Sequence, residues 1–420
     1  MKENKTKPDI RFKGFTEAWE QRKVSKITKF HKQGFYTIED YNDNKKYYLL
    51  RGTDFSENKL LLKDTPKINA TKKDYEAFKT ELGDFLIVRS GTVGTYGIVD
   101  VDIPAIFGSY LIDFRFDMEQ VTNEFFGYFY QSDLFKSQLN KIIQTSANTN
   151  INAENIKSTV ISLPNLDEQR KISEYLGNLD HLITLHQREC DQLKELKKSM
   201  LKKMFPRDES SIPEVRFAGF TDAWEQRKLG TLCSLITKGT TPKDKSGNGE
   251  VNFIKVENID IDNGEITSTS KISIAEHEGY LKRSKLKEND ILFSIAGTLG
   301  RVSVVKSSIL PANTNQALAI LRINEGYIPY LTTVLKGQAV EDFIRRNPTI
   351  GAQPNLSLEQ VNNLDISYPN YDEQVRIGQY FSNLDHLITL HQRNYNSLNR
   401  CKFSKITKNL LISHMVFIRK

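Results

Sequence analysis

Hydrophobic residues follow two different spacings along this chain of 420 residues, and each spacing occurs once in each half. Short apolar runs bounded by charged residues and glycine, such as residues 84–89 and 290–295, predict buried strands that end in turns. Residues 123–143 and 328–346 contain helical patches. Each half is therefore expected to form a mixed α+β globule of about 150 residues.

A longer spacing follows each globule. Apolar or histidine side chains recur every seven residues, at Ile172, Leu179, His186 and Leu193 and again at Ile377, Leu384, His391 and Leu398. Sustained seven-residue repeats predict coiled-coil packing. Because the two seams share residues, we expect the two helices to pair with each other, antiparallel. A helix over residues 167–204 is about 57 Å long at about 1.5 Å per residue, which indicates a spacer. An insertion of four residues near Ser199 is expected to lengthen it.

The chain is an internal repeat. Residues 11–23 and 216–228 agree at 11 of 13 positions, and residues 178–188 recur unchanged as residues 383–393. The segments between these anchors diverge, for example residues 36–79 and 240–286. A repeat that keeps its ends and varies its middle indicates one scaffold used twice to present two different surfaces.

This repeat divides the chain into four parts. They are a first globule (residues 1–165), a first helix with its linker (166–212), a second globule (213–370) and a second helix (371–420). Each half contains one tryptophan, Trp19 or Trp224. We interpret both as anchors of an opening strand.

Composition narrows the class of protein. The hydrophobic fraction is 38% and the mean hydropathy is −0.48, and no run approaches the roughly 20 apolar residues of a membrane span. The first residues lack the apolar core of a secretory signal, so the cytoplasm is the expected location. Three scattered cysteines, Cys190, Cys233 and Cys401, suit neither a disulfide framework nor a zinc ribbon. A net charge of +7 is compatible with a polyanionic partner without establishing one.

Two matching pairs of polar segments are candidates for contact with a partner. Glycine turns at residues 90–94 and 296–300 lack the ending of a nucleotide P-loop, and strand-like residues follow them, which favours hairpin turns. Asn and Gln at residues 146–150 and 351–355 suit the edge of adenine, although Asn is also an ordinary turn residue. With the basic residues near the variable segments, the candidate DNA-contacting residues are Arg51, Arg89, Ser90, Thr92, Thr95, Asn148, Asn150, Lys255, Thr298, Arg301, Gln353 and Asn355.

The sequence contains no evident catalytic or metal-binding set of residues. His181 and His186, like His386 and His391, are five residues apart, which places them about 140° apart on a helix and does not suit one ion. A role in helix pairing is the favoured interpretation. Residues 347–350 match the Asn-Pro-Pro-Tyr of amino-methyltransferases only in part, and no nucleophile elbow is present. We expect no catalytic residue, metal or cofactor in this chain.

In their order and their duplication, these motifs resemble those of the specificity (S) subunit of type I restriction-modification systems. The resemblance covers essentially the whole chain. It rests on the opening segments 8–15 and 213–220 and on the strand-and-turn segments 83–91 and 289–297. It also rests on segments 163–172 and 368–377, which both contain Asp-Glu-Gln. A further motif is Lys-Gly-Thr-Thr-Pro at 238–242, which Lys-Gln-Gly at 32–34 matches only in part.

The resemblance implies two pseudo-symmetric mixed α/β target recognition domains, separated by two long helices that form an antiparallel coiled coil. Each domain would read one half of a bipartite asymmetric site in double-stranded DNA, and the helices would set the number of unread base pairs. In this family the subunit is not catalytic. Two modification subunits methylate adenine with S-adenosylmethionine, and restriction subunits use ATP and Mg in translocation and cleavage.

Two other hypotheses stay open. The chain could be a fragment of a fused methyltransferase-nuclease, against which the missing Asn-Pro-Pro-Tyr and cofactor loop argue. It could also be a scaffold whose coiled coil is the functional part and whose globules bind protein.

Overall fold

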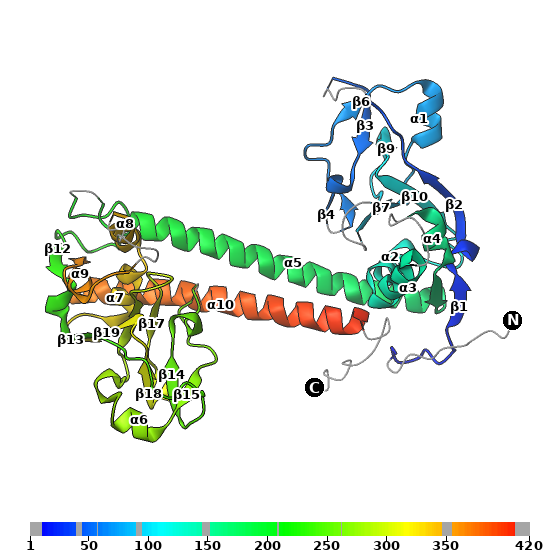
Figure 1. Ribbon diagram of the computed structural model, residues 1–420. Coiled ribbons are helices and arrows are strands. Elements are labelled where there is room, and N and C mark those ends of the chain that lie inside the picture. The colour runs from blue at the N-terminus through cyan, green and yellow to red at the C-terminus, as the bar shows by residue number, and fades with distance from the viewer. Residues whose placement is uncertain are drawn as a thin grey trace. The chain divides into compact units, whose positions relative to one another are not determined.

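The structure is a computed structural model that describes residues 11–38, 44–56, 58–89, 95–144, 152–207, 210–261, 263–346 and 355–407. The chain forms two units, of which the first comprises Met1–His186 and Asn394–Lys420 and the second Gln187–Arg393. Each unit therefore combines one globule with part of each long helix (Figure 1).

The first globule contains short strands and four helices. Its strands are β1 (Glu20–Lys23), β2 (Thr28–Gln33), β3 (Tyr47–Leu50), β4 (Phe55–Ser56), β5 (Lys59–Leu60), β6 (Lys67–Ile68), β7 (Phe85–Val88), β8 (Tyr96–Ile98), β9 (Ala105–Phe107), β10 (Leu111–Phe116) and β11 (Val160–Leu163). Its helices are α1 (Lys72–Phe78), α2 (Asn123–Gln131), α3 (Asp133–Gln144) and α4 (Ala153–Ser158), and the long helix α5 (Leu166–Lys203) follows.

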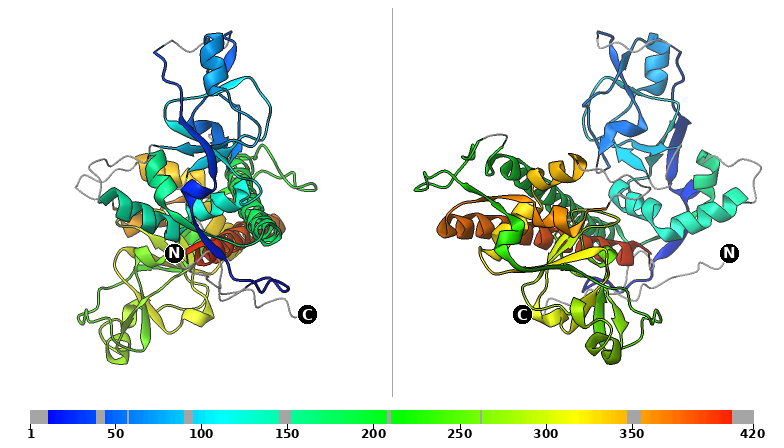
Figure 2. Two further views of the ribbon diagram at one scale, coloured as in Figure 1. Left: turned by 90° about the vertical axis from the view of Figure 1, so that its right-hand side faces the viewer. Right: turned by 60° about the vertical axis from the view of Figure 1, so that its left-hand side comes forward.

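These strands form a main sheet in the order β2-β10-β7-β8-β5-β4, a small sheet in the order β6-β3-β9, and a pair of β1 with β11. The strand β7 reads Phe-Leu-Ile-Val and is buried throughout, which explains its continuous apolar run. One face of the main sheet packs against α2, α3 and the start of α5 in a core rich in phenylalanine, including Phe85, Phe114 and Phe126. The small sheet lies at the end of the globule away from α5 (Figures 1 and 2).

The second globule repeats this plan. Its strands are β12 (Glu225–Lys228), β13 (Cys233–Lys238), β14 (Val251–Ile254), β15 (Ser270–Ile272), β16 (Ile291–Ser294), β17 (Val302–Val304), β18 (Ala312–Thr314), β19 (Leu318–Ile323) and β20 (Asp365–Tyr368). Its helices are α6 (Ile274–Glu278), α7 (Ile328–Leu335), α8 (Gln338–Arg346) and α9 (Leu358–Asn362), and the long helix α10 (Tyr371–Thr407) follows.

The sheet orders of the second globule are β13-β19-β16-β17, β15-β14-β18 and β12-β20. They match the first globule strand for strand where both have a strand, so β2, β3, β9 and β10 correspond to β13, β14, β18 and β19. This duplicated mixture of helices and mainly antiparallel sheets confirms the predicted α+β fold.

The two long helices pair antiparallel within each unit. In the first unit Lys402 of α10 forms an ion pair with Asp180 of α5, and in the second Lys197 of α5 lies 2.5 Å from Asp385 of α10. These pairs occupy equivalent positions in the repeat, because Asp180 and Asp385 belong to the identical segments 178–188 and 383–393. The predicted seam lies inside: Ile172, Leu179, Ile377 and Leu384 are buried, and His186, Leu193, His391 and Leu398 are half-buried.

The structure refines two of the predicted elements. The helical patch 123–143 contains two helices, because Ser132 has extended backbone angles and its hydroxyl accepts the N–H of Phe135 at 3.1 Å as the cap of α3. The patch 328–346 is likewise divided, between α7 and α8 at Lys336 and Gly337. No helix among the described residues has the length and apolar character needed to cross a membrane.

Candidate nucleic-acid interface

The sequence motifs that the two halves share bring an arginine, a tryptophan and a buried glutamate together in each unit. This group of three side chains is called the lock. In the first unit the Arg11 guanidinium donates to both carboxylate oxygens of Glu168, at 2.8 and 2.5 Å, and Trp19 Nε1 donates to the same carboxylate at 3.2 Å. Glu168 is fully buried and Trp19 is 3% exposed. The opening segment is therefore fastened to the first turn of α5, and Trp19 is an anchor, as predicted.

The second unit repeats this lock with Arg216, Trp224 and Glu373. The guanidinium bonds are 2.7 and 2.8 Å long and the indole bond is 3.1 Å long. The following glutamine extends each lock, because the Oε1 atom of Gln169 or Gln374 accepts the backbone N–H at the N-cap of α2 or α7. The Asp-Glu-Gln motif thus joins each globule to its long helix. The end segments that both halves share therefore have a structural role.

The divergent segments line a crevice in each unit. The first crevice, of about 700 Å³, lies between the residues after β2, the turn after β3 and the β9–β10 connection. The second, of about 210 Å³, lies between the residues after β13, the turn after β14 and Asn315 in the β18–β19 connection. Because these strands correspond, the two crevices lie between corresponding elements of the two globules.

A glycine brings the walls of each crevice together. The N–H of Gly34 donates to the Leu111 carbonyl at 2.9 Å, and that of Gly239 donates to the Leu318 carbonyl at 3.1 Å. A Cβ atom at Gly34 would lie 2.0 Å from the Gly108 oxygen, and one at Gly239 would lie 2.1 Å from the Thr314 oxygen. Only glycine permits this approach of two backbones, so both halves retain it while their other lining residues differ.

The first crevice presents aromatic rings and a fixed guanidinium. Tyr36 is 75% exposed and Tyr110 is 69% exposed. Arg51, which lines the same crevice, donates from Nε and Nη2 to the Asp54 carboxylate, at 3.2 and 3.0 Å, and from Nη2 to the Asp64 carbonyl at 2.9 Å. Guanidinium and phenol groups donate to base edges and phosphates, and rings contact the thymine methyl group.

The second crevice presents lysines and an amide at the same place in the fold. Lys255 replaces Arg51: its backbone N–H donates to Asn258 Oδ1 at 2.8 Å, as that of Arg51 does to Asp54 Oδ2 at 2.7 Å. The Lys255 ammonium lies 3.8 Å from Glu257. Lys245, Lys271, Asn315 and the acidic Asp244 complete this lining. Its lysines suit phosphates and guanine, and the amide of Asn315 suits adenine.

The predicted contact residues divide into four groups. Arg51, Thr95 and Lys255 line the crevices. Arg301, at the position of Thr95 in the second unit, donates from Nη1 to the carbonyls of Val256 and Ile259, at 3.3 and 2.6 Å, and so holds the turn after β14.

The remaining predicted residues lie away from both linings or outside the described residues. Arg89 is half-buried, and its N–H donates to the Tyr110 carbonyl at 2.9 Å. Thr298 and Asn355 are exposed, and Asn355 forms a β-bridge with Ala296. Ser90, Thr92, Asn148, Asn150 and Gln353 lie outside the described residues.

Several crevice residues escaped prediction from the sequence: Tyr36, Tyr110, Lys245, Lys271 and Asn315. Each crevice is assembled from segments far apart in the chain, so no single motif contains it. The available signal was the glycine shared by both halves, Gly34 and Gly239, with the variable residue Tyr36 or Thr241 two positions later.

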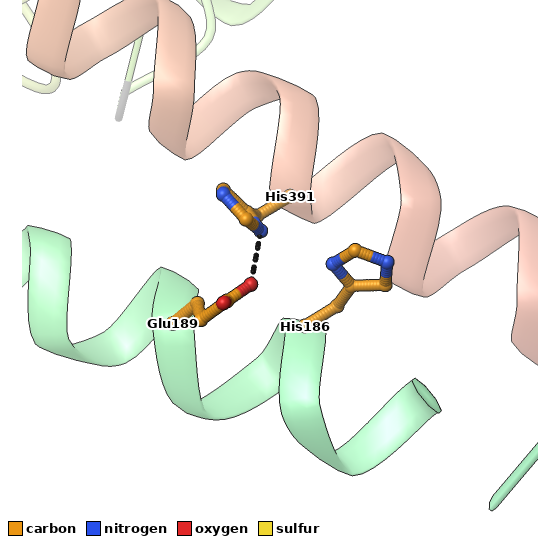
Figure 3. A group of neighbouring side chains, drawn as sticks. All are labelled: His186, Glu189 and His391. Carbon is orange, nitrogen blue, oxygen red and sulfur yellow. Dashed lines mark ion pairs between the residues drawn. The ribbon is translucent and has the colours of Figure 1, made fainter. Parts of the chain in front are cut away.

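Histidine contributes to the helix pair. Nδ1 of His391 on α10 lies 2.8 Å from Oε2 of Glu189 on α5, and the two side chains point toward one another (Figure 3). His186, the third side chain labelled there, belongs to the part of α5 assigned to the first unit. This contact joins α5 to α10 within the second unit, and the role of the histidines in helix pairing stays a prediction.

Comparison with known families decides what these duplicated domains are. The family model of the type I restriction modification DNA specificity domain matches residues 16–195 and 221–400. The chain belongs to this family. Each specificity domain spans one globule and most of the helix that follows it in the chain, so the predicted resemblance is confirmed. The chain is a DNA specificity subunit of the type I restriction-modification class.

Individual relatives and a solved structure agree with this membership. The chain is 22% identical over 427 residues to the MjaX specificity subunit of Methanocaldococcus jannaschii, with 96% of this chain and 95% of that protein covered. It is 30% identical over 285 residues to the MjaVIII specificity subunit of the same organism, with 63% of each chain covered. Its fold is similar to the crystal structure of a type I S subunit from M. genitalium, with a TM-score of 0.58, 16% identity and coverage of 97% of this chain and 100% of that one.

Proposed function

We propose that the two crevices are the reading surfaces of this specificity subunit, and that each reads one half of a bipartite asymmetric site in double-stranded DNA. The observation that carries the proposal is their equivalence in the fold combined with their difference in chemistry. The first offers Tyr36, Arg51 and Tyr110, whereas the second offers lysines and Asn315. Two crevices at equivalent places in the fold that carry different hydrogen-bond donors would select two different half-sites.

The positive charge of the chain and of the second crevice supports nucleic acid as the partner of these surfaces. The chain has a net charge of +7, and the second crevice gathers Lys245, Lys255 and Lys271. Basic groups contribute sequence-independent attraction to phosphates, and hydrogen bonds to base edges contribute the selection.

The subunit acts without catalysis of its own and directs partner subunits, as the family resemblance implies. Two modification subunits would use S-adenosylmethionine to methylate adenine, and restriction subunits would use ATP and Mg, all in the cytoplasm. The repeat supports two copies of one partner, because the exposed Leu182 and Leu185 of α5 recur as the exposed Leu387 and Leu390 of α10. Two like surfaces suit two like subunits.

A segment exchange tests the proposal. Residues 24–165 are replaced with the corresponding segment of a relative, which leaves Arg11, Trp19 and Glu168 of the lock in place. Methylated sites are then mapped on genomic DNA of a host that carries the modification partner. One half of the methylated motif should change and the other should stay. A change in both halves would contradict separate readers.

A second measurement separates this function from that of a protein scaffold. Binding of the purified chain to mixed genomic DNA should weaken steeply as the salt concentration rises, because phosphate contacts release counterions. A chain that binds no DNA, alone or with its modification partner, would favour the scaffold. Methyl transfer by the purified chain alone would favour the fused enzyme.

A further inference from the structure

The second unit contains a larger pocket that the reading surfaces do not use. It has a volume of about 910 Å³ and lies where β17 and α7 of the globule meet α5 and α10. Its lining includes Lys197, Val302, Thr333, Lys336 and Asp385. It therefore adjoins the helix pair rather than the small sheet that carries the crevice.

The first unit shows which side chains fill the equivalent place. The helices α2 and α7 begin after the caps Thr122 and Tyr327, so Tyr128 corresponds to Thr333. Tyr96 and Val302 are likewise the first residues of β8 and β17. Tyr96 and Tyr128 are buried, at 3% and 7% exposure.

The fit around these rings is close in the first unit and open in the second. A Cβ atom at Gly127 would lie 2.1 Å from the Tyr96 hydroxyl oxygen, and the second unit has Thr332 at this position. Where the first unit has two buried phenol rings, the second has the smaller Val302 and Thr333. The pocket therefore includes the space that corresponds to the two rings of the first unit.

A hydrogen-bond acceptor remains in the lining of this space. In the first unit Asp180 uses Oδ1 for Lys402 and Oδ2 for the Tyr128 hydroxyl, which donates at 3.1 Å. In the second, Asp385 Oδ1 accepts from Lys197 at 2.5 Å. Among the described residues, no hydrogen bond reaches Asp385 Oδ2, and the Thr333 hydroxyl donates to the Pro329 carbonyl instead. The pocket thus offers an acceptor where the first unit supplies a donor on a ring.

The lining of this pocket also contains a cation, Lys336. Lys336 replaces Gln131 at the end of the same helix, and its ammonium donates to the Asn263 carbonyl at 3.3 Å. Burial lowers the pKa of Lys336 from its usual value, although nearby Asp385 opposes that shift. A largely desolvated ammonium gains from an anion placed within reach. Lys306 adds an exposed cation to a lining that also contains Lys197 and the acidic Glu265.

We propose that this pocket binds a free nucleotide whose base carries an exocyclic amino group. The base takes the space of the missing phenol rings, its amino group donates to Asp385 Oδ2, and its phosphate accepts from Lys336. The volume suits a ligand of this size, since small-molecule pockets measure roughly 300–1,000 Å³, and it exceeds what one side chain of a partner protein would fill. The site is independent of the reading surfaces.

Calorimetric titration of the full-length chain tests the site with three probes. They are AMP, adenosine, which lacks the phosphate, and purine riboside 5′-monophosphate, which lacks the amino group. AMP should bind at least about tenfold more tightly than either analogue, because each analogue loses one charge-assisted hydrogen bond. Thr333→Tyr, which restores the residue of the first unit, should abolish binding. Lys336→Gln should weaken AMP about tenfold or more and leave adenosine unchanged.

Controls keep each result decisive. Lys282→Gln removes an exposed lysine outside the pocket and should leave AMP affinity unchanged, whereas a loss equal to that of Lys336→Gln would mean nonspecific attraction and overturn the site. Thermal melting establishes that each variant is folded. If Thr333→Tyr fails to fold, Val302→Tyr blocks the same space. No binding of AMP at millimolar concentration, or equal binding to a folded blocked variant, would also overturn the proposal.

Discussion

Glu168 and Glu373 each hold an arginine and a tryptophan from a segment more than one hundred residues earlier in the chain. Glu168→Ala would leave the Arg11 guanidinium without its carboxylate and the Trp19 N–H without its acceptor. Removing one partner of a buried ion pair costs about 3–5 kcal/mol. We expect hydrogen exchange to accelerate across the first unit and to stay unchanged in the second. Glu373→Ala is the matched variant with the opposite pattern, and equal effects on both units would contradict two separate locks.

Asp113 is a residue at which the two halves differ inside the core. It lies on β10 opposite Leu86, is fully buried, and its carboxylate is 3.4 Å from Arg115 Nε without a hydrogen bond. Burial, with a smaller contribution from the Asp84 charge, raises the pKa of Asp113 to about 8. The second half has Ile320 at this position, opposite Leu292.

This raised pKa predicts a dependence of stability on pH. Below about pH 4 the folded and unfolded chains both hold the proton, so Asp113 makes the free energy of unfolding no more dependent on pH there. Between about pH 4 and pH 8 only the unfolded chain releases it, so the free energy of unfolding falls as pH rises, by an amount on the order of a few kcal/mol. Asp113→Ile, taken from the second half, should flatten this fall for the first unit. Urea unfolding at a series of pH values measures the free energy of unfolding of both chains. If the Asp113→Ile variant showed the same dependence on pH as the original chain, Asp113 would be ionised in the folded state.

Among individual residues, the sequence predicted the role of the two structural tryptophans better than it predicted the side chains that line the crevices. Trp19 and Trp224 stand in motifs that repeat almost unchanged, so their role could be inferred without a structure. Tyr36 and Tyr110 are 74 positions apart in the chain and line one crevice because β2 pairs with β10 and Phe35 forms a bridge with Gly108. Arg301 looked like a free cation in sequence, yet its guanidinium is bonded to two backbone carbonyls.

The elements that form the crevices should separate the two half-sites. Tyr36→Ala and Tyr110→Ala alter only the first crevice, and Lys255→Ala alters only the second. A residue that reads a base should relax one position of its own half-site, whereas a phosphate contact should weaken binding to all sequences and lower the salt slope by about one. Mapping of methylated motifs and binding at several salt concentrations measure both effects.

A control for these variants is Lys282→Ala, which removes an exposed lysine in a turn that lines neither crevice. It should change neither the motif nor the salt slope. If all three crevice variants matched this control, the crevices would not be the reading surfaces.

Long elements were easier to predict than their interruptions. The seven-residue repeat gave the extent of α5 nearly to the residue, because the period is sustained over many turns. The division between α2 and α3 was missed, although Ser132 is a typical helix cap. Local capping competes with the apolar period there, and a pattern search that follows hydrophobic spacing overlooks it.

At the scale of the whole molecule, the helices as a spacer give the strongest prediction. The insertion point near Ser199 is unsuitable, because Met200, Leu201 and Met204 pack into the core of the second unit. The units divide within the helices, after His186 and after Arg393. Four residues inserted at both points would lengthen each helix by about 6 Å and rotate the helix beyond each insertion by about 40°.

Such a paired insertion should move the half-sites apart by one or two base pairs, since DNA rises about 3.4 Å per base pair. The sequence of each half-site should stay the same, because neither crevice changes. The seam gains a stutter, which coiled coils absorb by local unwinding. The spacing is read from methylated motifs on genomic DNA. An unchanged spacing with full activity would mean that the helices do not set the distance.

The division of the chain shows where sequence reasoning stops at this scale. The repeat places borders at residues 165, 212 and 370, where globules and helices follow one another along the chain. The spatial units instead divide inside the helices, because Ile172, Leu176 and Leu179 belong to the core of the first globule. Order along the chain was visible in the pattern, whereas the packing of the first helical turns onto a globule was not.

The helix pair also bears on ancestry. The core of each unit is completed by side chains from the long helix of the other repeat. Leu398 packs against the first core, and Leu193 and Met200 pack against the second. A chain with one repeat alone would expose that seam to water, yet it would carry both members of the ion pair, Asp180 and Lys197. Two identical half-length chains would therefore complete each other as a homodimer and read a palindrome. Gene duplication followed by drift of one crevice would turn that symmetric reader into an asymmetric one.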